Sequence, residues 1–211
     1  MELGDVSEKI RKRLDAKSAA REKGLRASRQ GIRECANSIR ATHRGELDLA
    51  QELMDAARRS LDAAQEAMQP FPDIYYAGFL QDSEKEYAEA RATFALINDK
   101  ELPTPEELHI GDAPYLNGLA EAIGELRRHT LDIMRQGNLE RGEQLLALMD
   151  DIYYVLVSMD YPDAMTGGLR RTTDVARSIM ERTRGDLSLT LVQRNLTDTI
   201  AEHRQRLDSD S

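Results

Sequence analysis

Apolar residues recur every three or four positions along almost the whole chain, and no stretch alternates with a period of two for long enough to form a strand. One stripe with intervals of three and four consists of Leu116, Leu119, Ile123, Leu126, Thr130 and Ile133. This spacing places side chains on one face of an α-helix. The sequence therefore predicts an all-α chain.

Seven helices are expected, over residues 5–42, 46–69, 73–100, 114–137, 139–159, 168–184 and 187–207. The second ends before Pro70 and Pro72, which cannot continue a helix, and Pro114 suits the first turn of the fourth. The stretch "ELPTPEELHIGDAP" holds three prolines and is the one clear loop. Long helices with short links predict one antiparallel bundle, with residues 1–211 as a single domain.

The composition excludes several classes of protein. A chain of 211 residues can bury a core without disulfides or metal ions to hold it together. The single cysteine, Cys35, allows no intramolecular disulfide and is expected to be structural. No apolar run approaches the roughly 20 residues of a membrane span, and "MELGDVSEKIRKRLD" lacks the apolar region of a signal peptide. We expect a cytoplasmic protein without membrane contact.

The net charge of −9 is unevenly distributed, since residues 1–44 hold 12 Lys and Arg against 6 Asp and Glu. This basic segment is the natural candidate to meet a polyanion such as RNA or single-stranded DNA. The candidates for phosphate contact are Arg29, Arg33, Arg40 and Arg44. The alternative is that a charge-dense helix only presents a solvated face.

Two carboxylates stand out in "EKEYAEARATF", at Glu86 and Glu89. On a helical wheel, Glu86 lies about 20° beyond the edge of the predicted apolar arc, and Glu89 lies about 60° further on the same side. Both head groups can therefore point into a seam between helices while their stems pack against apolar neighbours.

Two further acids lie later in the chain. The wheel places Asp151 beside the Leu145–Ile152 stripe and Asp150 nearly opposite, so Asp151 is the expected inward group. Glu125 lies away from its own apolar stripe but shares a narrow face with Gly118 and Ala122, where small residues would let another helix come close.

Buried like charges are costly unless a cation neutralises them, and a ligand set of oxygens with little His or Cys suits Mg²⁺ or Mn²⁺. Such an ion could activate a water and stabilise the charge that develops on a phosphoryl group. Alternatively, each acid pairs with Arg91, Arg127 or Arg128. The sequence lacks the two Glu-x-x-His motifs that a di-iron bundle places on different helices, and it lacks a P-loop, a dinucleotide-binding turn and a His-Glu-x-x-His motif.

Several stretches together resemble the family of translin and translin-associated factor X. They are "EKEYAEARATFALI", "YLNGLAEAIGELRR" at Tyr115–Arg128, "LMDDIYYVL" at Leu148–Leu156, and "ASRQGIRECANSIRATHRGE" with its Ser28-Arg29 and His43-Arg44 pairs. The likeness covers nearly the whole chain, and its most specific part is the Gly-Glu-Leu block. The acidic body of the chain is unusual for a nucleic-acid binder.

The resemblance implies a seven-helix bundle of an archaeal-type homologue that assembles into hollow, octamer-like homo-oligomers and binds RNA or single-stranded DNA. For the branch of translin-associated factor X it also implies a Mg²⁺-dependent endoribonuclease. That branch's acids correspond to Glu86, Glu89 and Asp151, with Glu125 as a fourth, as both the catalytic residues and the metal ligands. Translin itself lacks much of this cluster, so its presence favours the nuclease branch.

Two other functions stay open at this point. One is a non-catalytic scaffold that binds single-stranded nucleic acid, and the other is a helical oligomer without RNA or metal, in which the acids pair with neighbouring arginines.

Overall fold

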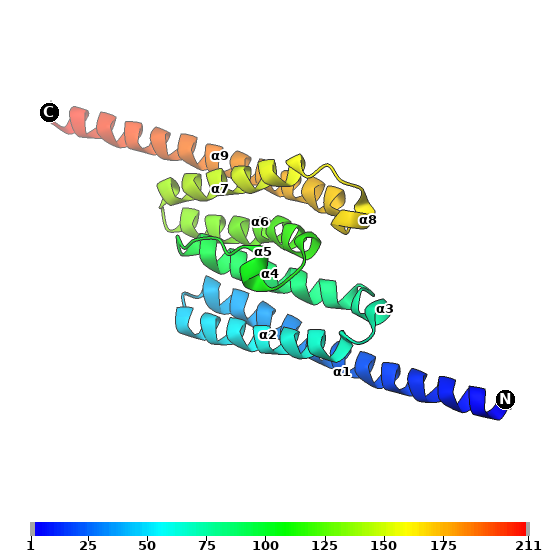
Figure 1. The fold of residues 1–211 in the computed structure, drawn as a ribbon. Helices are drawn as coiled ribbons and strands as arrows, with labels where there is room; N and C mark the ends of the chain where they lie inside the picture. Colours follow the sequence, from blue (N-terminus) through cyan, green and yellow to red (C-terminus); the bar gives the residue numbers. More distant parts are fainter. Residues whose placement is uncertain (1–2, 210–211) are drawn as a thin grey trace. The chain divides into compact units, whose positions relative to one another are not determined.

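The structure is a computed structural model that describes residues 3–209, and no strand occurs within this range (Figure 1). The helices are α1 (Leu3–His43), α2 (Leu47–Met68), α3 (Pro72–Tyr75), α4 (Phe79–Ile97), α5 (Pro105–Leu108), α6 (Asp112–Arg135), α7 (Leu139–Ser158), α8 (Asp163–Thr166) and α9 (Leu169–Ser209). The predicted all-α fold class is confirmed. Among the helices of the described residues, none is long and apolar enough to cross a membrane.

The chain divides into two compact units. The first runs up to Leu119 and includes Ala164–Gly167, and the second comprises Ala120–Asp163 with the residues from Gly168 on. The division falls inside α6, which is one unbroken helix.

The first unit buries a core between α1, α2 and α4, which run beside one another in Figure 1. Met54, Leu61 and Met68 of α2 are fully buried, as is Leu80 of α4. A Cβ at Gly24 of α1 would lie 2.6 Å from the sulfur of Met68. Gly24 therefore allows α1 and α2 to come close, and α1 continues through this position without a break.

The second unit packs the later part of α6 together with α7 and α9. Leu126, Leu145 and Leu187 are each 0% exposed, and a Cβ at Gly142 would lie 3.1 Å from Cδ1 of Leu187. Arg127 bridges two of these helices within the unit, since it pairs with Asp186 at 2.8 Å.

The helix predicted over 73–100 is divided into α3 and α4. Gly78, between them, has a φ of +97°, a backbone conformation that glycine adopts far more readily than other residues. The side chain of Gln81 accepts a hydrogen bond from the Gly78 N–H at 2.9 Å and so caps the start of α4. The predicted loop also contains a helical turn, α5, which begins with the capping box of Thr104 and Glu107.

The helices predicted over 168–184 and 187–207 are one helix, α9. A helical glycine costs only about 1 kcal/mol relative to alanine, and Gly185 is flanked by Thr183 and Leu187, which are both 0% exposed. Because packing continues on both sides of Gly185, the helix does too.

Candidate functional site

Glu86 and Glu89 lie next to each other on α4. Both are half-buried, and each offers a carboxylate oxygen within 4.8 Å of the other's. Helix α4 turns Tyr87 inward, where it is 3% exposed, so Glu86 lies at the edge of the buried face, as the wheel predicted. The amine of Lys85 lies 3.6 Å from Oε1 of Glu86. Two anionic groups are thus held together on one partly buried turn.

The negative charge on this turn affects the pKa of the Cys35 thiol on α1. Cys35 is 1% exposed, and its pKa is raised well above the usual value, first by burial and then by the negative charges of Glu86, Glu34 and Glu89. The predicted structural role of Cys35 fits this burial. The acidic pair on α4 therefore lies close to the buried side of α1.

Helix α6 comes very close to α4 at Gly118. A Cβ at Gly118 would lie 2.6 Å from Cβ of Ala88, 2.7 Å from the carbonyl oxygen of Lys85 and 2.9 Å from the backbone nitrogen of Glu89. The sequence predicted that Gly118 would admit another helix, and the structure confirms it. The start of α6 is therefore packed directly on the turn that carries the two acids.

The other two predicted acids belong to the second unit. Glu125 of α6 has a side chain 26% exposed and lies 3.8 Å from Arg128, so one of the arginine pairings expected as an alternative is present. Since Glu86 and Glu89 lie in the first unit, membership of all four acids in one site stays a prediction.

The wheel was wrong about the orientation of the two aspartates of α7. Asp151 is exposed, whereas Asp150 has a side chain 29% exposed and pairs with Arg184 of α9 at 2.6 Å. The apolar stripe alone does not show where α9 lies. Helix α9 packs on the side of α7 that carries Asp150, and this contact decides which aspartate is covered.

Two of the arginines named as alternative partners of the acids, Arg127 and Arg91, also contact other groups. Arg127 pairs with Asp186 and donates to the hydroxyl of Thr183 at 3.1 Å. Arg91 donates to the hydroxyl of Tyr87 at 3.3 Å.

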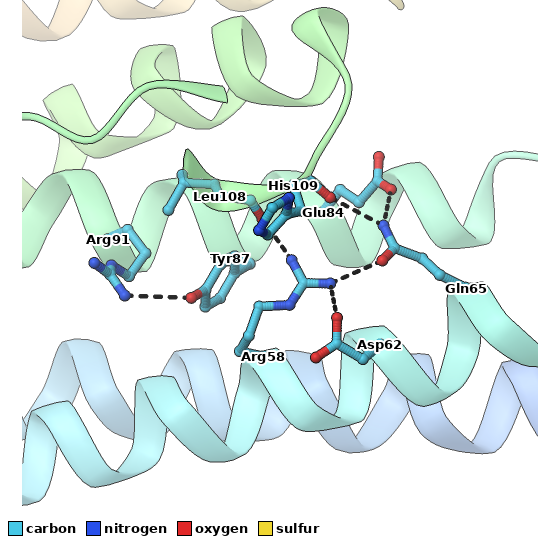
Figure 2. Close-up of polar contacts among 8 residues, drawn as sticks. All are labelled: Arg58, Asp62, Gln65, Glu84, Tyr87, Arg91, Leu108 and His109. Carbon is cyan, nitrogen blue, oxygen red and sulfur yellow. Dashed lines mark hydrogen bonds and ion pairs between the residues drawn. The ribbon is translucent and has the colours of Figure 1, made fainter. Parts of the chain in front are cut away.

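Glu84 is a buried acid that the sequence analysis missed. It is only 5% exposed, and burial raises its pKa, although hydrogen bonds from Gln65 and Gly111 and the nearby charge of Arg58 act in the opposite direction. Figure 2 shows Glu84 beside Gln65 and the backbone at His109. A signal was available, because Glu84 lies four residues after Leu80 and three before Tyr87, inside the apolar arc.

The four predicted phosphate-contacting arginines are exposed: Arg29, Arg33, Arg40 and Arg44. At about 100° per residue Arg29, Arg33 and Arg40 fall within an arc of about 40°, while Gly31, Cys35 and Ser38 are buried on the other side of α1. These three arginines form one exposed face, which we call the α1 arginine face. Arg44 follows the end of α1 and pairs with Glu46 at 2.6 Å.

These features define a class of protein: an all-α chain of long helices with a half-buried carboxylate pair beside a tight helix contact. No protein-family model matches the chain. Uncharacterized protein MJ0175 of Methanocaldococcus jannaschii is 34% identical over 195 residues, which cover 92% of this chain and 85% of that protein.

Solved structures give a more specific relation. A structure of AfC3PO in complex with duplex RNA and a crystal structure of AfC3PO are each similar with a TM-score of 0.81 and 33% identity, over 89% of this chain and 97% of that one. The chain belongs to the translin-like family, as an archaeal-type homologue. A crystal structure of apo-NeC3PO, 20% identical over 90% of this chain and 97% of that one, shares the fold with a TM-score of 0.74.

Proposed function

We propose that the protein binds RNA and hydrolyses it as a Mg²⁺- or Mn²⁺-dependent endoribonuclease. The observation that carries the proposal is the half-buried pair of Glu86 and Glu89, whose carboxylate oxygens approach within 4.8 Å. Two oxygen ligands of one such ion lie at most about 4 Å apart, so a small side-chain rotation would let both bind it. An all-oxygen donor set is the chemistry that these ions prefer.

Glu125 is a further proposed ligand from the family resemblance, and it is half-buried on α6 in the second unit. Asp151, the remaining acid of the resemblance, is exposed on α7.

The residues of this chain would divide the work. Glu86 and Glu89 would hold the cation and fix its position beside the scissile phosphate. When bound, Mg²⁺ supplies Lewis-acid stabilisation of the charge that develops on the phosphoryl group. The guanidinium groups of the α1 arginine face would hold the RNA backbone through its phosphates, with little dependence on base sequence.

RNA is the proposed substrate because AfC3PO, at 33% identity, forms a complex with duplex RNA. Single-stranded DNA remains a second ligand to be tested. A non-catalytic scaffold would use the same arginines but not the acidic pair. Metal dependence of cleavage therefore separates the two functions.

The test uses end-labelled single-stranded and duplex RNA with the full chain, with Mg²⁺, with Mn²⁺ or with EDTA. We expect cleavage by the wild type with either metal and none with EDTA. Glu89→Gln keeps the side-chain shape but removes an anionic ligand, and it should reduce the cleavage rate roughly 100-fold or more. RNA retention on filters should not change.

Glu140→Gln is the matched control, since Glu140 is an exposed acid in the first turn of α7, and it should cleave like the wild type. A wild type that retains RNA but leaves it intact with both metals would contradict the nuclease proposal and support the scaffold.

We also propose that the chain assembles with copies of itself. An exposed apolar row runs along the later part of α9: Leu189, Val192, Leu196, Ile200 and Leu207 are each between 53% and 64% exposed. In Figure 1 this part of α9 extends beyond α7. A second α9 in antiparallel orientation would place Leu196 opposite Ile200 and Leu189 opposite Leu207.

A further inference from the structure

The side-chain amide of Gln65 on α2 joins three groups of the first unit (Figure 2). Its Nε2 donates to Oε1 of Glu84 at 2.9 Å and to the backbone oxygen of His109 at 3.2 Å. Its Oε1 accepts from Arg58 at 2.8 Å. Only one orientation of the amide satisfies all three contacts, because a flipped amide would turn its oxygen toward a carboxylate and a carbonyl.

Arg58 extends this network to the turn before α6. Its guanidinium donates to the backbone oxygen of Leu108 at 2.5 Å and pairs with Asp62 at 2.8 Å. It also lies over the ring of Tyr87, 5.4 Å from the ring centroid. Arg58 thus holds the segment by a backbone contact one residue before the one that Gln65 makes.

The same segment is anchored from α4. Oε2 of the buried Glu84 accepts from the backbone nitrogen of Gly111 at 3.5 Å, and the side chain of Leu108 is 2% exposed within the core. Residues 108–111 are therefore held at two carbonyl oxygens, one amide and one apolar side chain. This is dense anchoring for a loop, whose polar backbone groups usually meet water.

The position of this segment is transmitted to the site because α6 follows it directly. Helix α6 begins at Asp112, and the backbone nitrogen of Tyr115 bonds to the oxygen of Gly111 at 3.1 Å. Gly118 lies seven residues beyond Gly111, about 10 Å along a rigid helix. Gly118 packs closely on the backbone of α4. A shift of residues 108–111 would therefore change how α6 packs on α4 at Gly118.

We propose that Gln65, together with Arg58 and Glu84, is a positioning residue that fixes the start of α6 in the register that brings Gly118 onto α4 beside Glu89. This inference rests on the proposed function and adds a residue that does not itself touch metal or RNA. Gln65 thereby sets how the start of α6 packs on the turn of α4 that carries Glu86 and Glu89.

Amide hydrogen exchange on the full chain, followed by mass spectrometry, tests the register without metal or RNA. Gln65→Met keeps the length of the side chain but removes its donor and acceptor. We expect amide exchange in residues 109–118 to become at least about tenfold faster. The reason is that local opening of this segment would no longer require breaking the hydrogen bonds of Gln65. Gln65→Glu should do the same, because it sets a carboxylate against Glu84 and the His109 carbonyl.

Two control variants separate positioning from general stability. Asp62→Asn removes the exposed partner of Arg58 and should change exchange in 109–118 less than about twofold. Leu61→Ala, one turn before Gln65 and 1% exposed, should raise exchange across α2 and α4 instead of in one segment. If Gln65→Met affects this segment no more than Asp62→Asn does, or only as part of a uniform rise, the proposal is wrong.

Calorimetric titration with Mn²⁺ alone gives the second measurement. Gln65 supports the helix contact beside Glu86 and Glu89 without touching the metal. We therefore expect the Kd of Gln65→Met for Mn²⁺ to rise on the order of tenfold, the lower end of what a lost supporting contact costs in metal affinity. The Kd of Asp62→Asn should stay at the wild-type value. Unchanged affinity in Gln65→Met, with wild-type binding intact, would overturn the link to the site. A wild type that binds no Mn²⁺ would instead overturn the proposed function, and the exchange pattern would still decide the register.

Discussion

Gly118 has no side chain, and atoms of α4 occupy the space in which a Cβ would stand. Two of the three nearest atoms belong to the backbone, at 2.7 Å and 2.9 Å from the position of that Cβ. Backbone atoms of a packed helix cannot rotate away as a side chain can. A single methyl group at this position must therefore move one of the two helices.

Gly118→Ala is expected to lower the free energy of unfolding by about 1–3 kcal/mol or more, as for other overpacked positions. Gly185→Ala is the control, because Gly185 is also helical and has nothing within 4 Å of its Cβ position. It should raise stability by about 0.4–1 kcal/mol. Urea unfolding of both variants measures this, and a Gly118→Ala as stable as the wild type would contradict the close approach.

At the scale of the element, α1 has two faces with different partners. Its buried face carries Gly24, Gly31 and Cys35 against α2 and α4, and its exposed face carries Arg29, Arg33 and Arg40. What the α1 arginine face contacts is part of the proposed function.

The α1 arginine face should give RNA binding its salt dependence. Each phosphate contact that is lost reduces the slope of log Kobs against log salt by about 1. We therefore expect Arg29→Gln with Arg33→Gln to reduce that slope by about 2 and to weaken binding to all sequences alike. Filter binding over a salt series measures the slope.

Arg135→Gln, with its exposed arginine at the end of α6, is the control and should retain the wild-type slope. Equal slopes for the wild type and for the double variant would show that this face does not meet the phosphates.

At the scale of the whole molecule, the apolar row of α9 is expected to be covered by another copy of the chain. Leu196→Glu with Ile200→Glu places charges at the centre of the row, and burying an unpaired charge costs several kcal/mol. The mass measured by size-exclusion chromatography with light scattering should fall. Circular dichroism should show unchanged helix content.

Asn195→Glu adds a charge to the same exposed stretch, about 100° round α9 from Leu196 and outside the row, and should leave the mass unchanged. A double variant that keeps the wild-type mass would show that the row is not the assembly surface.

The sequence by itself determined the helical class, the edges of most helices and the partly buried position of Glu86. These features follow from periodicity, since a helix that buries one face must repeat its apolar residues every three or four positions. The family was also predicted from local stretches, above all the Gly-Glu-Leu block.

Only the tertiary structure decided which groups meet across helices. Periodicity gives the face on which a residue lies but not the helix that covers it, so Asp150 was assigned to the wrong side and Glu84 was overlooked among apolar neighbours. The break at Gly78 and the continuity through Gly185 depend on what packs beside each glycine. For the same reason, the anchoring of residues 108–111 by Gln65, Arg58 and Glu84 became visible only when α2, α4 and the loop were brought together.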